Sequence, residues 1–131
     1  MSVSLKSIGA ITLFVEDPAR SKVFYGRVFD APHVYEDDAS TMFDFEGTVV
    51  NLLRATEAVG LIAPAAVAPQ EPGSRLQLTI WVDDTDAACA RLAEQGVELL
   101  NGPLDREWGV RTACFADPDG HVWEVAQRLS R

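Results

Sequence analysis

The sequence predicts an α+β fold built from two tandem βαβββ modules, because the chain of 131 residues nearly repeats itself. Residues 11–17 (ITLFVED) resemble residues 78–84 (LTIWVDD), and a helical pattern follows each of them. Further along, residues 47–51 (GTVVN) resemble residues 120–124 (GHVWE). Self-similarity of this kind indicates a duplicated supersecondary unit. We expect the two copies to form a curved mixed sheet around a shared cleft.

The first strand of each module is predicted from alternating apolar residues. Residues 8–15 alternate around Ile11, Leu13 and Val15, and residues 75–82 show the same alternation. A period of two is typical of strands that are buried on one face only. We expect the apolar set of each strand to pack beneath a helix.

A helix is predicted after each of these strands. Asp17 and Asp84 are suited to cap the two helix N-termini, and Pro18 is tolerated at the first helical position. The first helix is expected to run to about Phe29, and the second to end near Gly96. The expected inner faces carry Val23, Phe24 and Phe29 in the first helix and Ala88, Leu92 and Ala93 in the second.

Three shorter strands are predicted after each helix. They cover residues 32–36, 40–46 and 48–54 in the first module and residues 97–101, 109–116 and 121–128 in the second. The segment Asp117-Pro118-Asp119-Gly120 joins the last two strands as a turn, because Pro suits the second turn position and Gly the left-handed one.

The domain organisation that we expect is one domain over residues 1–131. Module one covers about residues 5–54 and module two about residues 75–128. Residues 55–74 are rich in Ala and Pro and show no sustained period, so they are predicted to be a linker. Its apolar centre, residues 59–62, would cover the module junction or pack on the cleft or a subunit interface.

Composition and charge exclude several classes of partner. The chain contains no stretch of ~20 apolar residues, and its first residues lack the apolar core of a signal peptide, so we expect a cytoplasmic protein with no membrane partner. The formal charge of −9 repels nucleic-acid phosphates but is compatible with a neutral, aromatic or cationic small molecule. Cys89 and Cys114 lack C-x-x-C spacing and are expected to be buried free thiols.

The residues that face the cleft follow from the alternation of the strands. If the apolar set lies beneath the helices, the residues between its members point to the opposite face. Such a face would be mostly apolar with few polar groups, which suits small-molecule binding. Some of its aromatic residues could instead belong to the core. The predicted ligand-binding residues are Thr12, Phe14, Asn51, Gln77, Thr79, Trp81, Trp108 and Glu124.

Several motifs together resemble the vicinal oxygen chelate superfamily, that of glyoxalase I, bleomycin-resistance proteins and extradiol dioxygenases. They are Phe24-Tyr25-Gly26, Trp108-Gly109 and residues 115–124 (FADPDGHVWE), set within paired βαβββ modules. The resemblance covers nearly the whole chain and implies the fold of that superfamily. Its members include lyases, dioxygenases, isomerases, thiol transferases and drug binders without catalytic activity.

The resemblance also implies where a metal would bind. In metal-using members the ligands occupy the positions of Ala10, Asn51, Gln77 and Glu124 in this chain. Only Glu124 is a strong ligand, and Ala10 has no ligand atom, whereas catalytic divalent sites use about three strong protein ligands. We therefore expect no metal or other cofactor, with a divalent metal disfavoured. His33 and His121 are expected to face solvent or to form local hydrogen bonds.

The function that we expect is metal-independent binding of a small molecule. Similarity to the bleomycin-resistance branch implies a homodimer that sequesters an aromatic or cationic natural product, as in antibiotic resistance. The alternative is a metal-dependent lyase, isomerase or dioxygenase of the same superfamily, in which Glu124 would be the catalytic residue. A third interpretation is a structural or regulatory protein that binds another protein through its sheet. The sequence identifies neither the ligand nor a firm catalytic residue.

Overall fold

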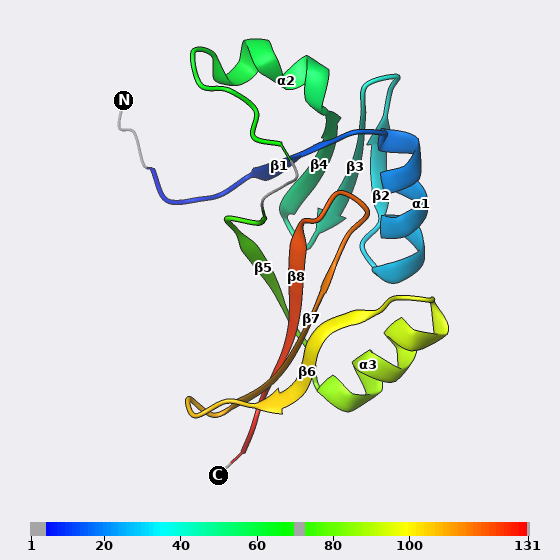
Figure 1. The fold of residues 1–131 in the computed structure, drawn as a ribbon, viewed down its shortest axis with the longest axis vertical. Coiled ribbons are helices and arrows are strands. Elements are labelled where there is room, and N and C mark those ends of the chain that lie inside the picture. The colour runs from blue at the N-terminus through cyan, green and yellow to red at the C-terminus, as the bar shows by residue number, and fades with distance from the viewer. Residues whose placement is uncertain (1–4, 70–72, 131) are drawn as a thin grey trace. The chain divides into compact units, whose positions relative to one another are not determined.

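The computed structural model describes residues 5–69 and 73–130 of the chain. The chain divides into two compact units, one ending at Ala68 and the other beginning at Pro69. Each unit holds one four-stranded sheet and one βαβββ module (Figure 1). No helix within the described ranges is long and apolar enough to cross a membrane. The predicted α+β fold of two modules is confirmed, as a pair of four-stranded mixed sheets.

Unit one contains the first module and a short additional helix. Its sheet has the order β1-β4-β3-β2, in which β1 is parallel to β4 and the other pairs are antiparallel. The elements of the module are β1 (Ala10–Val15), α1 (Pro18–Val28), β2 (His33–Glu36), β3 (Ser40–Phe45) and β4 (Thr48–Arg54).

Unit two repeats this arrangement. Its sheet has the order β5-β8-β7-β6, again with one parallel pair, β5 with β8. The elements are β5 (Gln77–Trp81), α3 (Thr85–Glu94), β6 (Leu99–Asp105), β7 (Val110–Ala116) and β8 (Val122–Arg128). Apart from the end of β6, the predicted element boundaries lie within two residues of these.

The two module helices begin as predicted. Asp17 Oδ1 accepts a hydrogen bond from Ala19 N at 3.0 Å, and Asp84 Oδ1 accepts one from Ala87 N at 3.1 Å. Each carboxylate thus satisfies a backbone N–H that has no partner within its helix. The side chain of Thr85 then anchors α3 to the sheet, because its hydroxyl donates to the carbonyl oxygen of Arg111 at 2.8 Å.

The inner faces of the helices differ in part from the prediction. Val23 is 64% exposed and Ala93 is also exposed, so both expected core positions were wrong. The buried side of α1 follows a spacing of three to four residues, and Val23 lies off this stripe. The buried residues of α1 are Pro18, Ser21, Phe24, Tyr25 and Val28.

Aromatic rings fill the core of unit one. Tyr25 is fully buried, and its ring stacks on Phe29 with 5.3 Å between centroids and lies 6.0 Å from Phe43. Leu13 and Val15 of β1 are buried as well, as the alternation predicted. Burial of such side chains stabilises each by about 1.5–3 kcal/mol.

The predicted linker over residues 55–74 begins with a helix that was not predicted from the sequence. Its first eight residues form a helix, α2 (Ala55–Ile62), which packs on β4 and β1. Ala58 faces the sheet and is fully buried, whereas Val59 and Leu61 are exposed. A helix of two turns is too short to show a period in sequence, and Gly60 within it lowers its intrinsic helix propensity. Residues 70–72 of the predicted linker lie outside the described residues.

Strand β6 is longer than the predicted strand of residues 97–101. It continues through Gly102-Pro103 to Asp105, with shifts in its pairing to β7 on either side of Asn101. Gly and Pro ordinarily end a strand in sequence analysis. Here β6 is an edge strand, so Pro103 needs no backbone donor on its outer side.

Candidate functional site

The sheet of unit one has an open face, defined by Ala10, Thr12 and Phe14 of β1 and by the β4 residues paired with them. Thr12 pairs with Asn51, and Phe14 pairs with Leu53. Since Leu13 and Val15 are buried on the other face, the structure brings Thr12, Phe14 and Asn51 onto one side of this sheet.

Asn51 is the polar centre of this face. Its side-chain oxygen is buried and accepts no hydrogen bond within the described part of the chain. Across the β3–β4 pair its neighbour is Met42, so the amide lies beside an apolar side chain. A buried acceptor without a donor is costly, and such groups in native proteins usually meet a water molecule or a ligand.

The sheet of unit two presents a second open face, defined by Gln77, Thr79 and Trp81 of β5 and by Glu124, Ala126 and Arg128 of β8. Thr79 pairs with Glu124, and its hydroxyl donates to Glu124 Oε1 at 2.9 Å. Gln77 lies two residues before Thr79 and therefore points to the same side. The structure thus gathers these predicted residues on one face.

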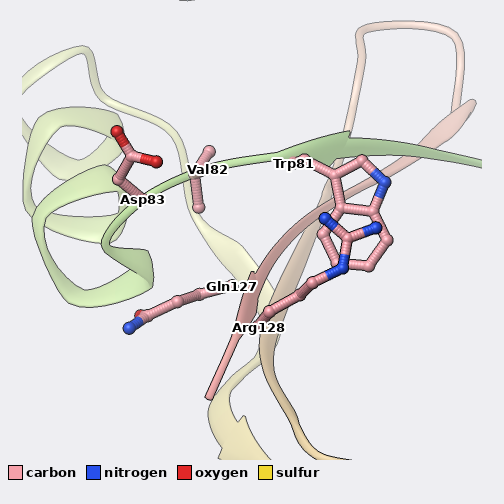
Figure 2. Close-up of a pocket in the computed structure, with 5 residues that line it drawn as sticks. All are labelled: Trp81, Val82, Asp83, Gln127 and Arg128. Atoms are coloured by element: carbon pink, nitrogen blue, oxygen red, sulfur yellow. The ribbon is translucent and has the colours of Figure 1, made fainter. Parts of the chain in front are cut away.

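Trp81 and Arg128 form a stacked pair at the end of this face. Trp81 is 53% exposed, and the guanidinium carbon of Arg128 lies 3.8 Å from the centroid of its ring. Together with Val82, Asp83 and Gln127 they line a pocket of about 210 Å³ (Figure 2). A guanidinium over an indole is an attractive cation–π contact.

Trp81 was predicted from the sequence, whereas Arg128 was not. Trp81 pairs with Ala126, and Arg128 stands two residues further along β8, so alternation alone places it on the same face. The signal was therefore present in the sequence, once the register of β5 against β8 is known.

Arg106 is a second missed arginine of this face. Its Nε donates to Thr112 Oγ1 at 2.9 Å, and Thr112 is 2% exposed. Thr112 pairs with Ala126 on β8, which in turn pairs with Trp81. Arg106 follows β6 in a loop, and nothing in the local sequence indicates that it folds back over the sheet.

Trp108 occupies the tip of the hairpin between β6 and β7. The turn is closed by a hydrogen bond from Gly109 N to Arg106 O at 3.1 Å, and Gly109 has a φ of 87°. Trp108 is 72% exposed and is not among the residues that line the pocket beside Trp81. Its part in ligand binding stays a prediction.

The four positions that correspond to metal ligands do not fit a catalytic divalent ion. Ala10 has no ligand atom in its side chain, Asn51 and Gln77 carry neutral amides, and Glu124 is the one carboxylate among the four. Catalytic sites use carboxylate, imidazole or thiolate ligands, about three of them. Over the described ranges, no three or more His, Cys, Asp or Glu side chains gather in a way that could hold a metal.

Both histidines form local hydrogen bonds, as expected. His33 Nε2 lies 2.8 Å from Thr41 Oγ1, and His121 Nδ1 lies 2.9 Å from Asp117 Oδ2. Asp117 is buried and also accepts from the backbone N–H of His121, which ties the turn before β8 together. These contacts account for both rings as structural groups.

The two cysteines are free thiols, with Cys114 buried and Cys89 half-buried. Burial raises the pKa of Cys89, and the charge of Asp86 raises it further. A raised pKa leaves little thiolate at neutral pH, so Cys89 is a poor nucleophile.

Comparison with known proteins identifies relatives over nearly the whole chain. The family described as Glyoxalase/Bleomycin resistance protein/Dioxygenase superfamily matches residues 7–125. The chain is 30% identical over 123 residues to the uncharacterized protein YraH of Bacillus subtilis, which covers 91% of this chain and 96% of YraH. It is 27% identical over 122 residues to the metallothiol transferase FosB of Lysinibacillus sphaericus, covering 93% of this chain and 82% of FosB.

Solved structures give the same result for the fold. A glyoxalase/bleomycin resistance protein/dioxygenase from Nocardioides superposes with a TM-score of 0.85 at 23% identity, covering 98% of this chain and 87% of its own. TnmS3, an antibiotic-binding protein from Streptomyces sp. CB03234, superposes with a TM-score of 0.71 at 26% identity, covering 97% and 99%. The structural relatives thus include a protein that binds an antibiotic, and the sequence relatives include an enzyme.

Proposed function

Because the chain belongs to the Glyoxalase/Bleomycin resistance protein/Dioxygenase superfamily, we propose that it is a metal-independent protein that binds and sequesters an aromatic or cationic natural product. The observation that carries this proposal is the donor set at the positions of the family's metal ligands. Ala10 stands at one of them, and Glu124 is the only carboxylate among the four. The mechanism is stoichiometric capture, with no chemical step.

The chemistry of the two open faces supports binding. Each face combines apolar or aromatic side chains with few polar groups, which is the usual composition of small-molecule sites. On unit one, Phe14 shares a face of the sheet with Asn51, whose side-chain oxygen has no partner among the described residues and is able to accept a hydrogen bond from a ligand. On unit two, the exposed ring of Trp81 offers a stacking surface. The likeness to an antibiotic-binding protein points the same way.

The likeness to a metallothiol transferase favours a second candidate, a metal-dependent enzyme of the same superfamily. In this chain such an enzyme would depend on Glu124 as its one strong ligand. Amide oxygens of Asn51 and Gln77 are weak ligands for the divalent ions that such enzymes use. Measurement of metal binding therefore separates the two candidates.

The first experiment is elemental analysis of protein purified without chelator, followed by titration with Zn²⁺, Mn²⁺ and Ni²⁺ monitored by tryptophan fluorescence. The capture proposal predicts no stoichiometric metal and no saturable response. Near-stoichiometric metal, lost in Glu124→Gln but kept in the matched control Glu98→Gln at an exposed site, would overturn it in favour of the enzyme.

The second experiment titrates the protein with planar aromatic antibiotics by isothermal titration calorimetry. Capture predicts saturable binding, with one ligand per binding site and no chemical change in the ligand recovered afterwards. Trp81→Leu is expected to weaken binding, because stacking on a tryptophan adds about 0.5–1.5 kcal/mol beyond the area that is buried. If the recovered ligand is chemically altered, the proposal of capture without chemistry fails.

A further inference from the structure

Two arginine side chains lie on the open face of unit two, and both are held in place. The guanidinium of Arg128 is stacked on Trp81 at 3.8 Å, and Arg106 is fastened to Thr112 by a hydrogen bond of 2.9 Å. The residues that hold the two arginines, Trp81 and Thr112, both pair with Ala126. They therefore belong to one row across β5, β8 and β7. Both guanidinium groups are thus attached to the same row of the sheet.

Neither guanidinium has an acidic partner among the residues that the structure describes. Over that part of the chain, Arg106 and Arg128 form no ion pair, although the sequence carries 20 acidic residues and a net charge of −9. On the opposite side of the same sheet, by contrast, Arg111 pairs with Asp105 at 2.6 Å and with Asp86 at 3.2 Å. Both guanidinium groups therefore remain without a neutralising carboxylate among the described residues.

The acidic residues nearest to this face do not pair with either arginine. Glu124 accepts its hydrogen bond from Thr79, in the neighbouring row. Asp83 lines the pocket, but Figure 2 shows its carboxylate at the other end from the guanidinium of Arg128. Arg128 therefore keeps its N–H donors available in the pocket.

We propose that this face recognises the oxyanion of a planar aromatic ligand, with Arg128 and Arg106 as its donors and Trp81 as the platform that orients Arg128. A guanidinium matches a carboxylate with two parallel hydrogen bonds, and its flat surface accepts an aromatic ring. This inference rests on the proposed small-molecule binding and chooses between its two ligand classes. A cation is disfavoured here, because Arg128 already covers one face of the Trp81 ring.

The test uses three probes that share one ring system and differ in charge: 2-naphthoate, 2-naphthamide and 2-naphthylmethylammonium. Each is titrated into the full-length protein by isothermal titration calorimetry at low salt. We expect 2-naphthoate to bind roughly tenfold or more tighter than the neutral amide, because a hydrogen bond between two charged groups is stronger than one to a neutral group. The ammonium probe is expected to bind weakest.

Variants assign the effect to these residues. Arg128→Gln and Arg106→Gln are each expected to weaken 2-naphthoate binding by roughly tenfold while changing 2-naphthamide binding little. Arg128→Lys keeps the charge but loses the planar fork, and it is expected to recover only part of the affinity. Arg27→Gln, an exposed position of α1 in unit one, removes the same charge elsewhere and is the matched control.

The outcomes separate this inference from the proposed function. Equal binding of the three probes, or tighter binding of the ammonium, overturns the inference and leaves small-molecule capture standing. The inference is also overturned if Arg27→Gln weakens 2-naphthoate as much as Arg128→Gln, because general electrostatics would then explain the effect. If no probe binds to a protein that does bind an antibiotic, the inference fails. If neither binds, both fail.

Discussion

Individual polar groups carry most of the functional information in this chain. The oxygen of Asn51 is buried without a partner, and the guanidinium of Arg128 lacks an acidic one among the described residues. The carboxylate of Glu124, by contrast, is engaged by Thr79. Polar groups that a fold leaves unsatisfied in a preformed surface are the natural contacts for a ligand, because binding then supplies the missing hydrogen bond.

Gly102 is expected to be irreplaceable for steric reasons. It has a φ of 97°, and a Cβ there would lie 2.5 Å from Thr112 O and 2.6 Å from Ala113 Cα. We expect Gly102→Ala to lower the free energy of unfolding by about 3 kcal/mol, from backbone strain and overpacking together. Chemical denaturation measures the change.

Gly47 provides the matched control for this prediction. Its φ is 102°, but a Cβ would meet nothing within 4 Å. Gly47→Ala should therefore carry only the backbone penalty, about 1–2 kcal/mol. Equal losses in the two variants would show that close packing at Gly102 contributes nothing.

Asp37 is expected to make stability depend on pH. The hydroxyl of Tyr35 and the backbone N–H of Ala39 hold the pKa of Asp37 below its usual value. As the pH falls, Asp37 is therefore protonated in the unfolded chain before it is protonated in the folded one. Its contribution to the free energy of unfolding is complete above about pH 4 and is lost as the pH falls through the lower pKa of the folded state.

Asp37→Asn tests this expectation by chemical denaturation at several pH values. The variant should be less stable than the parent protein at pH 7, and the difference should shrink as the pH falls below about 4. The neighbouring Asp38→Asn removes the same charge at an exposed site and serves as the control. A difference that stays constant with pH would contradict the assignment to the Asp37 carboxylate.

Among the elements, α2 shows how packing decides structure where sequence is ambiguous. Its residues are compatible with a helix, but nothing in their order marks a buried side. The sheet supplies that side, since Ala58 is fully buried against it while Val59 and Leu61 remain exposed. Most of the stability of a helix this short comes from such contacts rather than from intrinsic propensity.

The packing of α2 gives a direct prediction. Ala58→Leu places a larger side chain in a fully buried position and is expected to lower the free energy of unfolding by about 1–3 kcal/mol. Glu57→Leu introduces the same side chain at the exposed preceding residue and should change stability by less than about 0.5 kcal/mol. If Ala58→Leu is neutral, α2 does not pack on its sheet in solution.

For the molecule as a whole, we expect a homodimer. Unit one leaves large apolar side chains exposed at Ile8, just before β1, and at Val59 and Leu61 of α2, which packs beside β1. Surfaces that expose several large apolar side chains often mark an interface between subunits. Size-exclusion chromatography with light scattering should therefore give twice the chain mass of 14.3 kDa.

The double variant Ile8→Arg with Leu61→Arg places charge in this surface and should shift the mass to that of one chain. Val23→Arg is the control, because Val23 is similarly exposed but belongs to α1 and not to the segment before β1 or to α2. A parent protein of 14.3 kDa in solution would contradict the dimer.

The sequence determined those features of this protein that depend on neighbours in the chain. Strand alternation predicted that Thr12, Phe14 and Asn51 share a face, and Asp17 and Asp84 marked where the helices begin. The duplication predicted the βαβββ order of both units. Whether the residues of these faces contact a ligand stays a prediction, because alternation gives direction and not contact.

Tertiary structure alone determined the features that depend on strand register and on packing between distant segments. The row from Trp81 to Thr112 exists because β5, β8 and β7 align in one register, and the contact with Thr112 brings Arg106 to the face that carries Arg128. The extension of β6 past Gly102 likewise depends on its place at the sheet edge. Each of these contacts joins segments that lie far apart in the chain, and a local sequence pattern does not predict how such segments align.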